Sequence, residues 1–248
     1  MSGPTPPTLE PLAEDWQRAL AIVAHPDDME YGAAAAVARW TGQGKQLVYC
    51  MVTSGEAGMD TVAPEQARQV REAEQVAAAA VVGVNDVEFL GFPDGVVEYG
   101  LPLRRALART VRLHRPDIVL TTNFRDTYGG LWLNQADHIA VGRATVDAVR
   151  DAANRWVFRE LLDEGLQRWA GVRQVWAAGS PNAKHAADTT GTFEAGVASL
   201  EAHTAYLAAL GDAMGDAREF LEAVGRSVGT GLGTRYAAAF EVLPIRAG

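Results

Sequence analysis

The sequence predicts a single α/β domain with a mainly parallel, Rossmann-like sheet flanked by helices. In the first half of the chain, short apolar runs rich in branched residues alternate with longer helical segments, the pattern of strand–helix–strand crossovers. The chain has 248 residues, 48% of them hydrophobic and 21% charged, which suits one domain with a substantial core. We expect residues 1–14, rich in proline, to form a flexible tail, and residues 15–248 to form an α/β hydrolase domain whose C-terminal third shapes the substrate site.

The elements follow in order along the chain. Pro26 cannot donate a hydrogen bond to a sheet and therefore ends the first strand, and Pro64 opens the second long helix. Asp137 occupies the position where a helix N-cap belongs. We expect strands at 20–24, 45–53, 86–90, 117–122, 172–177 and 236–243, and helices at 30–40, 66–82, 103–114, 138–153, 193–210 and 212–224. The polar, glycine-containing segment 123–135 is predicted to be a functional loop.

Composition excludes several classes of protein. The net charge of -9 argues against nucleic-acid binding, which requires basic residues to neutralise phosphates. No apolar run approaches the roughly 20 residues of a membrane span, and no leader-like segment opens the chain. Cys50 is the only cysteine, which excludes a disulfide framework and favours a reducing, cytoplasmic location. A homo-oligomer is possible.

The run from His25 to Asp28 is the strongest candidate for a functional site. It follows the first strand directly, and ligands bind at the carboxyl ends of strands in open α/β sheets. An imidazole and a carboxylate beside a second carboxylate form a partial metal site with a spare base. His138, which follows the fourth strand, is the best candidate for a third ligand. We therefore expect one divalent ion, zinc, held by His25, Asp28 and His138, with Asp27 free to act as general base.

The other histidines fit this site less well. His114 lies at the far end of a helix, and His185 lies in a loop without a recognisable pattern. His203 falls within a predicted helix, where a structural role is more common than a catalytic one.

These residues belong to a longer set of motifs with a recognisable order. The sequence resembles the LmbE-like (PIG-L) zinc-dependent deacetylases over about its first 145 residues. The motifs that carry the resemblance are His25-Pro26-Asp27-Asp28 with Glu30 and Gly32, Thr53-Ser54-Gly55-Glu56, Arg71-Glu72-Ala73-Glu74 ahead of Val82-Gly83-Val84, Asp94-Gly95, and Asp137-His138-Ile139-Ala140-Val141-Gly142.

The resemblance implies an activity and a set of roles. Family members remove an acetyl group from N-acetylglucosamine-containing molecules, and relatives act in thiol-sugar biosynthesis, in cleavage of mycothiol conjugates and in antibiotic tailoring. The resemblance implies that His25, Asp28 and His138 are the metal ligands and that Asp27 is the base. It also implies that the small-molecule substrate is an N-acylated amino sugar. Arg71 and Asp94 match positions that contact sugar hydroxyls. From the residues alone, Arg71 could instead pair with Glu74 on a helix surface, and Asp94 could be a turn residue.

One departure from the family pattern concerns the acid catalyst. The second motif of the family usually reads His-Pro-Asp-His, whereas Gln135 occupies its first position here. Glutamine can donate a hydrogen bond to an oxyanion but cannot transfer a proton. Acid catalysis would then fall to Asp137, Tyr128, His203 or a protonated Asp27.

Two alternatives follow within the family, and one outside it. The chain could be an amidase of the mycothiol-conjugate type, or a catalytically weak homologue that binds metal and sugar, as the glutamine suggests. A dinucleotide-binding role for the glycines at 229–233 is disfavoured because they occur late in the chain, where we expect a loop. Near the C-terminus, Ala238 stands where relatives often carry glutamate.

Overall fold

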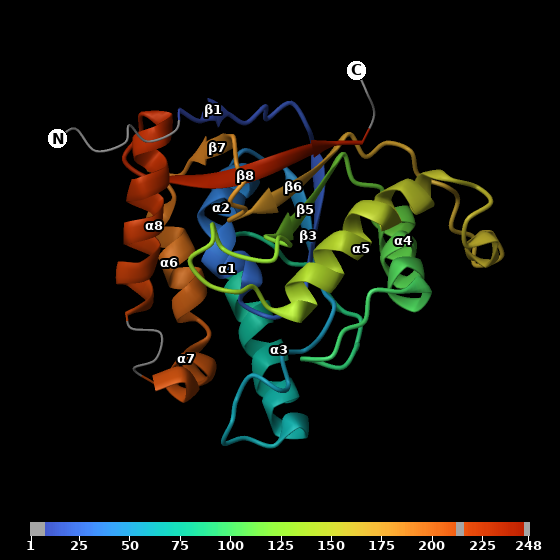
Figure 1. Cartoon of the computed structure of the whole chain (residues 1–248), viewed down its shortest axis with the longest axis horizontal. Helices are drawn as coiled ribbons and strands as arrows, with labels where there is room; N and C mark the ends of the chain where they lie inside the picture. Colours follow the sequence, from blue (N-terminus) through green and yellow to red (C-terminus); the bar gives the residue numbers. More distant parts are fainter. Residues whose placement is uncertain (1–7, 212–215, 246–248) are drawn as a thin grey trace.

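The eight-stranded sheet at the centre of the molecule has helices on both faces (Figure 1). The computed structural model describes residues 8–211 and 216–245. Strand order across the sheet is β1-β7-β8-β6-β5-β2-β3-β4, and all neighbouring pairs are parallel except those that β8 makes with β6 and β7. The predicted mainly parallel α/β architecture is therefore confirmed.

The strands are β1 (Glu10–Pro11), β2 (Arg18–Val23), β3 (Gln46–Met51), β4 (Val87–Phe89), β5 (Ile118–Thr122), β6 (Gln174–Ala178), β7 (His185–Asp188) and β8 (Ala237–Pro244). The helices are α1 (Asp28–Gly32), α2 (Ala34–Gly42), α3 (Pro64–Val81), α4 (Leu101–His114), α5 (Ala136–Ala153), α6 (Phe193–Glu201), α7 (Thr204–Leu210) and α8 (Ala217–Leu232), with a 3-10 turn, η1, at Arg159–Leu162.

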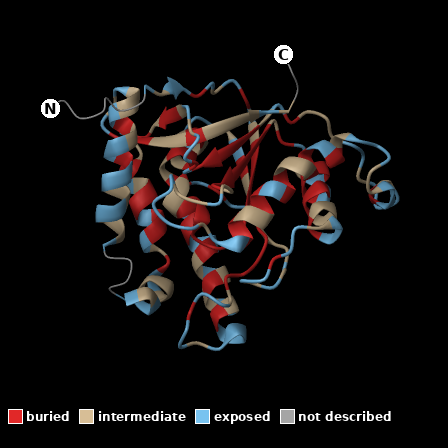
Figure 2. Cartoon of the chain, viewed as in Figure 1, coloured by how far each residue is buried: buried red, intermediate tan, exposed pale blue. Residues whose placement is uncertain are grey.

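Strand β2 is buried on both faces, which explains why its sequence is continuously apolar. Ala21 and Val23 face one core, in which α2 packs with a cluster of tryptophans. Leu20 and Ile22 face the second core, under α4 and α5. Burial concentrates along the central strands and the inward faces of these helices (Figure 2). The carboxyl end of β2 therefore opens between two rigid layers.

The N-terminal segment is more ordered than the sequence predicts. Within the predicted tail, β1 pairs with β7 at the sheet edge, and the side chain of Leu12 is buried. Glu14 accepts hydrogen bonds from Arg39 and Trp40 of α2. Residues 1–7 of that predicted tail lie outside the described residues.

Several predicted helices differ from the observed ones. The predicted helix at 30–40 is two helices, α1 and α2, because Ala33 has a non-helical φ of -150°. The predicted helix at 193–210 is likewise interrupted, at His203. The sequence predicts a loop for the glycines at 229–233, but Gly229 and Gly231 lie in the last turns of α8, which ends at Leu232 and is capped by Gly233 in the left-handed conformation. This helix begins later than predicted, and residues 212–215 lie outside the described residues.

Three short elements, β1, β7 and η1, have no counterpart in the sequence prediction. In the part of the chain that the structure describes, none of the helices combines the length and the apolar character that crossing a lipid bilayer requires.

Candidate metal centre

The turn from His25 to Asp28 joins β2 to α1 at the carboxyl end of the central strand. Asp27 has a φ of 88°, a left-handed conformation that is unusual for a non-glycine residue. Hydrogen bonds hold the turn in place: among them, the backbone N–H of His25 donates to Asp28 at 2.9 Å, and that of Asp27 donates to the side chain of Gln75 at 2.8 Å. The strained turn places the side chains of Asp27 and Asp28 in different surroundings.

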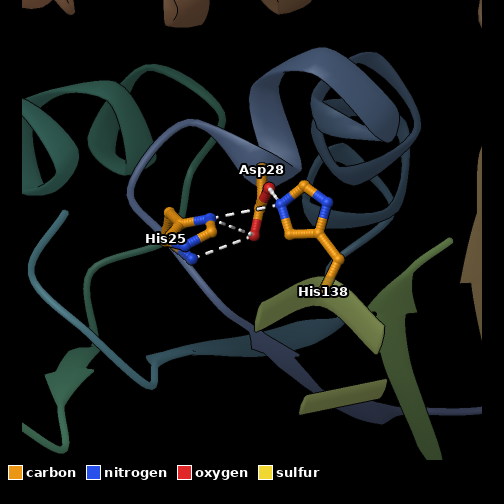
Figure 3. Close-up of side chains that lie close together, drawn as sticks. All are labelled: His25, Asp28 and His138. Atoms are coloured by element: carbon orange, nitrogen blue, oxygen red, sulfur yellow. Dashed lines mark hydrogen bonds and ion pairs between the residues drawn. The ribbon is translucent and has the colours of Figure 1, made fainter. Parts of the chain in front are cut away.

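Three of the predicted residues converge on one point (Figure 3). Nδ1 of His25 lies 3.1 Å from Nε2 of His138, which lies 2.9 Å from Oδ1 of Asp28. The distance from Nδ1 of His25 to Oδ2 of Asp28 is 3.8 Å. All three side chains are buried, and His138 comes from the first turn of α5, 113 residues along the chain from His25.

The second ring nitrogen of His25 is held by two carboxylates. Nε2 lies 3.1 Å from Asp94 and 3.3 Å from Asp137. Burial lowers the pKa of His25, but the hydrogen bonds to Asp137 and Asp94 outweigh burial and raise this pKa to about 10. The two carboxylates hold the N–H of Nε2, and the geometry leaves Nδ1 facing the other two ligand candidates, where a bound ion would take the place of a proton. Such an outer carboxylate is typical of metal-binding histidines.

Asn134, which the sequence analysis did not identify, orients His138 in the same way, through the ring nitrogen that faces away from the other ligand candidates. Nδ1 of His138 lies 2.9 Å from the side-chain oxygen of Asn134 and 3.3 Å from the hydroxyl of Tyr128. The hydrogen bond of Nδ1 to Asn134 orients the ring so that Nε2 points at His25 and Asp28, where a bound ion would take the place of any proton on it. Asn134 lies four residues before His138, a spacing that gives no signal in the sequence.

The donor set fits a zinc-sized cation. An ion with bonds of about 2.1 Å in tetrahedral geometry holds its ligand atoms roughly 3.4 Å apart, close to the three separations observed here. Burial raises the pKa of Asp28, but the His138 imidazole outweighs burial and lowers this pKa to about 2, so the carboxylate is ionised. Two ring nitrogens and one ionised carboxylate oxygen form a group that could hold a metal ion. Each of these three residues is also oriented by a hydrogen bond to a neighbouring residue.

Asp27 lies beside this group but is not part of it. Its carboxylate pairs with the guanidinium of Arg71 at 3.2 Å and is a hydrogen-bond partner of Tyr206. Burial raises the pKa of Asp27 to about 6, although the positive charge of Arg71 acts to lower this pKa. A carboxylate adjacent to the three ligands but held by other residues is the arrangement that a general base requires.

Arg71 is an interior residue, which excludes the alternative of a surface pair with Glu74. Its side chain is buried, donates to the carbonyl oxygens of Pro26 at 2.6 Å and Gly55 at 3.2 Å, and packs against the ring of Tyr206. Glu74 instead accepts hydrogen bonds from the N-terminus of α7.

Asp94 is more than a turn residue. Beyond its contact with His25, it accepts the backbone N–H of Ala57 at 2.7 Å, and its pKa is lowered because these hydrogen bonds outweigh burial. The predicted sugar contacts of Arg71 and Asp94 stay predictions.

Asp137 and Gln135, the candidates for acid catalysis and oxyanion binding, occupy different environments. Asp137 is buried in the first turn of α5 and accepts backbone N–H groups of Gly95 at 2.7 Å and Val97 at 3.0 Å. Gln135, not Asp137, is the N-cap residue of α5, and its side chain is exposed. Burial opposes ionisation of Asp137, but its hydrogen bonds to His25 and the two amides lower its pKa.

His203 lies between α6 and α7 and is fully buried. Its Nε2 is 3.8 Å from Oε2 of Glu30, which lies two residues after the metal-ligand candidate Asp28. His203 therefore lies next to α1 and does not join the three ligands.

Comparison with known proteins places these features in a family. Residues 20–149 match the family described as PIG-L: GlcNAc-PI de-N-acetylase. The probable N-acetyl-alpha-D-glucosaminyl L-malate deacetylase 2 of Bacillus anthracis is 29% identical over 137 residues, which are 52% of this chain and 58% of that protein. The mycothiol S-conjugate amidase of Streptomyces coelicolor is 29% identical over 164 residues, covering 56% of this chain and 54% of that protein.

The similarity in fold covers more of the chain than the similarity in sequence. The structure of N,N'-diacetylchitobiose deacetylase from Pyrococcus horikoshii superposes with a TM-score of 0.84 at 20% identity, covering 94% of this chain and 85% of that one. The chain spans about half the length of the curated relatives it matches. The matched segment runs from β2 into α5 and contains every ligand candidate, and the chain therefore belongs to the PIG-L family of GlcNAc-PI de-N-acetylases.

Proposed function

We propose that this protein is a zinc-dependent N-deacetylase that hydrolyses the acetamide of an N-acetylglucosamine-type sugar or of a related natural-product or thiol-sugar conjugate. The observation that carries the proposal is the convergence of His25, Asp28 and His138 while Asp27 stays outside the ligand set. The names of the related proteins support the same bond class, because they describe deacetylases of N-acetylglucosaminyl compounds and an amidase.

The chemistry divides between the ion and the side chains. A zinc ion in this site would act as a Lewis acid towards the amide carbonyl and would lower the pKa of water towards about 7. Asp27 accepts a proton from the attacking water, and Arg71 holds that carboxylate in place through their ion pair. Once protonated, Asp27 returns the proton to the departing amine, since glutamine at position 135 cannot supply one.

The remaining predicted residues take supporting roles in this proposal. Asp137, ionised and bound by two backbone amides, orients His25. Gln135 lies on the exposed rim at the start of α5, where its side-chain amide can donate to the oxyanion. Arg71 and Asp94 are proposed to contact the hydroxyls of the sugar.

Acetate release from a panel of N-acetylglucosaminides and thiol-sugar conjugates tests this function. Activity should be lost after dialysis against a chelator and restored by zinc. A zinc-loaded protein that releases acetate from no member of a broad panel would contradict the proposal. A preference for thiol conjugates would favour an amidase of the mycothiol-conjugate type, the second candidate, which the relative from Streptomyces coelicolor supports.

A further inference from the structure

The carboxylate of Asp27, the proposed base, has a hydrogen-bond partner in the C-terminal third of the chain. This partner is Tyr206, which lies in the short helix α7. The segment that matches the family ends at residue 149 and does not include this tyrosine. A side chain from outside the matched segment therefore reaches the residue at the centre of the proposed reaction.

The ring of Tyr206 packs on the other partner of Asp27. The guanidinium carbon of Arg71 lies 3.7 Å from the centre of this ring, which is a cation–π contact. The loop at 55–58 packs against the same guanidinium. A Cβ at Gly58 would lie 2.4 Å from Nη1 of Arg71 and 3.5 Å from Cε2 of Tyr206. The ring, the guanidinium and the loop are thus in contact with one another, which restricts the movement of each.

The backbone of Tyr206 is held by Glu74 of α3. The carboxylate of Glu74 accepts the backbone N–H of Ala205 at 2.5 Å, the hydroxyl of Thr204 at 3.1 Å and the backbone N–H of Tyr206 at 3.3 Å. A carboxylate at this position satisfies N–H groups that the first turn of a helix leaves unpaired. Glu74 and Arg71 are three residues apart and share one face of α3, beside which α7 lies (Figure 1). One face of α3 therefore fixes both the backbone and the ring of Tyr206.

Tyr206 is the donor in its hydrogen bond with Asp27. Burial and the negative charge of Asp27 raise the pKa of Tyr206 above its ordinary value, although the charge of Arg71 acts to lower it. The hydroxyl therefore keeps its proton, and a protonated hydroxyl beside a carboxylate donates. Tyr31 also responds to the charge of Asp27, but its buried hydroxyl has no hydrogen-bond partner among the described residues. Tyr31 therefore does not supply this bond.

Two partners on different helices restrict a carboxylate more than one partner does. Nη2 of Arg71, on α3, lies 3.2 Å from Oδ2 of Asp27, and this contact alone leaves the carboxylate free to turn about its side-chain bonds. The hydroxyl of Tyr206, on α7, adds a second point of attachment. A base has to present its oxygen to the attacking water within hydrogen-bond reach, and a small error in position lowers the rate.

We propose that Tyr206 is a positioning residue for the deacetylase reaction: its hydroxyl fixes the orientation in which Asp27 accepts the proton of the attacking water. This inference rests on the proposed function and adds to it a residue from the C-terminal third. A hydroxyl that acts on the base, and not on the substrate, affects the chemical step and leaves substrate binding unchanged.

Tyr206→Phe tests the role of the hydroxyl, because phenylalanine retains the ring over Arg71 and removes only the donor. In steady-state hydrolysis by the zinc-loaded protein, kcat should fall about tenfold, while KM and the zinc content stay within about twofold of wild type. Tyr99→Phe is the matched control, since it also removes a hydroxyl that donates to a carboxylate, that of Asp147 at 2.8 Å, ahead of α4. Its kcat should equal that of wild type. A wild-type kcat in Tyr206→Phe overturns the inference, and so does a change confined to KM, which would assign the hydroxyl to the substrate.

The same substitution in an Asp27→Asn background shows whether the hydroxyl acts through Asp27. Because no base is left to orient, the residual rate of the double variant should stay within about twofold of that of Asp27→Asn alone. A further tenfold loss would mean that Tyr206 acts on another group, and it would overturn the inference.

Crystal structures of the zinc-loaded wild type and Tyr206→Phe give a readout that does not depend on turnover. The wild type should show the hydroxyl of Tyr206 about 2.7 Å from a carboxylate oxygen of Asp27. In the variant, the carboxylate should be turned or divided between two orientations. The same single orientation in both proteins overturns the inference even if the enzyme hydrolyses its substrate. A wild type that hydrolyses no amide would reject the proposed function, whereas the two structures would still decide whether Tyr206 orients Asp27.

Discussion

The side-chain oxygen of Gln75 accepts the backbone N–H of Asp27 at 2.8 Å, so a residue of α3 holds the strained turn that carries the proposed base. The amide nitrogen of Gln75 donates to Glu30 at 3.1 Å, which fixes the orientation of the glutamine. Both ends of a fully buried side chain are thus used to hold a residue in the left-handed region, a conformation with an energetic cost.

Gln75→Met should lower kcat by about tenfold and leave both KM and the bound zinc nearly unchanged. Methionine has a similar volume but cannot accept the N–H of Asp27, so the carboxylate loses its fixed position while the ligands remain. Zinc content by mass spectrometry and steady-state kinetics together check this. A Gln75→Met protein with the wild-type kcat would remove Gln75 from this role.

Asp27→Asn should retain zinc and lose at least about a hundredfold in kcat, because an amide cannot accept the proton of the attacking water. The ion pair with Arg71 becomes a hydrogen bond from the charged guanidinium to a neutral amide oxygen, so we expect the fold to persist. Circular dichroism and zinc content serve as controls for folding and metal binding. Undiminished turnover would show that another group is the base.

His138→Ala should lose metal and activity together, since it removes one of three ligand candidates that lie within 4.8 Å of one another. His185→Ala is a suitable control because this histidine lies in β7, near the sheet edge. Zinc stoichiometry after dialysis distinguishes the two variants. A His138→Ala protein that still binds one tightly held zinc per chain would place the metal elsewhere.

Gln135→His should raise turnover at least about tenfold if the proton donor limits the reaction. The side chain lies at the exposed N-cap of α5, so the substitution disturbs little of the packing. The comparison of kcat for good and poor leaving amines gives the readout, with the gain largest for the poorest leaving group. No gain for any amine would mean that acid catalysis is already supplied by another residue.

The first half of the fold could be predicted because its elements follow simple rules. The run from Leu20 to Ala24 is buried on both faces, and Pro26 ends the strand, so the position of His25 at the sheet edge follows from the sequence. His138 could be identified because it too follows a buried strand. The breaks at Ala33 and His203 could not be predicted, since alanine-rich segments favour a continuous helix.

The supporting residues of the site were missed for a different reason. Gln75 acts only through contacts with residues that the fold brings near, and Asn134 acts on His138 four residues further along the chain, but neither amide has a distinctive sequence context. Tyr206 likewise reaches Arg71 and Asp27 from a helix more than 130 residues away along the chain. Roles of this kind depend on tertiary geometry, which hydrophobic periodicity and motif spacing do not specify.

Glu14→Gln should destabilise the fold by about 1–3 kcal/mol at pH 7. Glu14 is a partly buried acceptor for Arg39, Gln43 and Trp40, and these hydrogen bonds outweigh burial and lower its pKa below 4.5. Because the folded-state pKa is the lower one, the carboxylate contributes fully above pH 4.5, and its contribution is lost as the pH falls through the folded-state pKa. The difference in stability between wild type and Glu14→Gln should therefore shrink on acidification, as urea unfolding at pH 7 and pH 3 can measure.

Glu194→Gln, which alters an exposed ion pair with Arg218, should change stability little at either pH. A difference for Glu14→Gln that stays constant down to pH 3 would mean that the carboxylate charge at this position does not stabilise the fold.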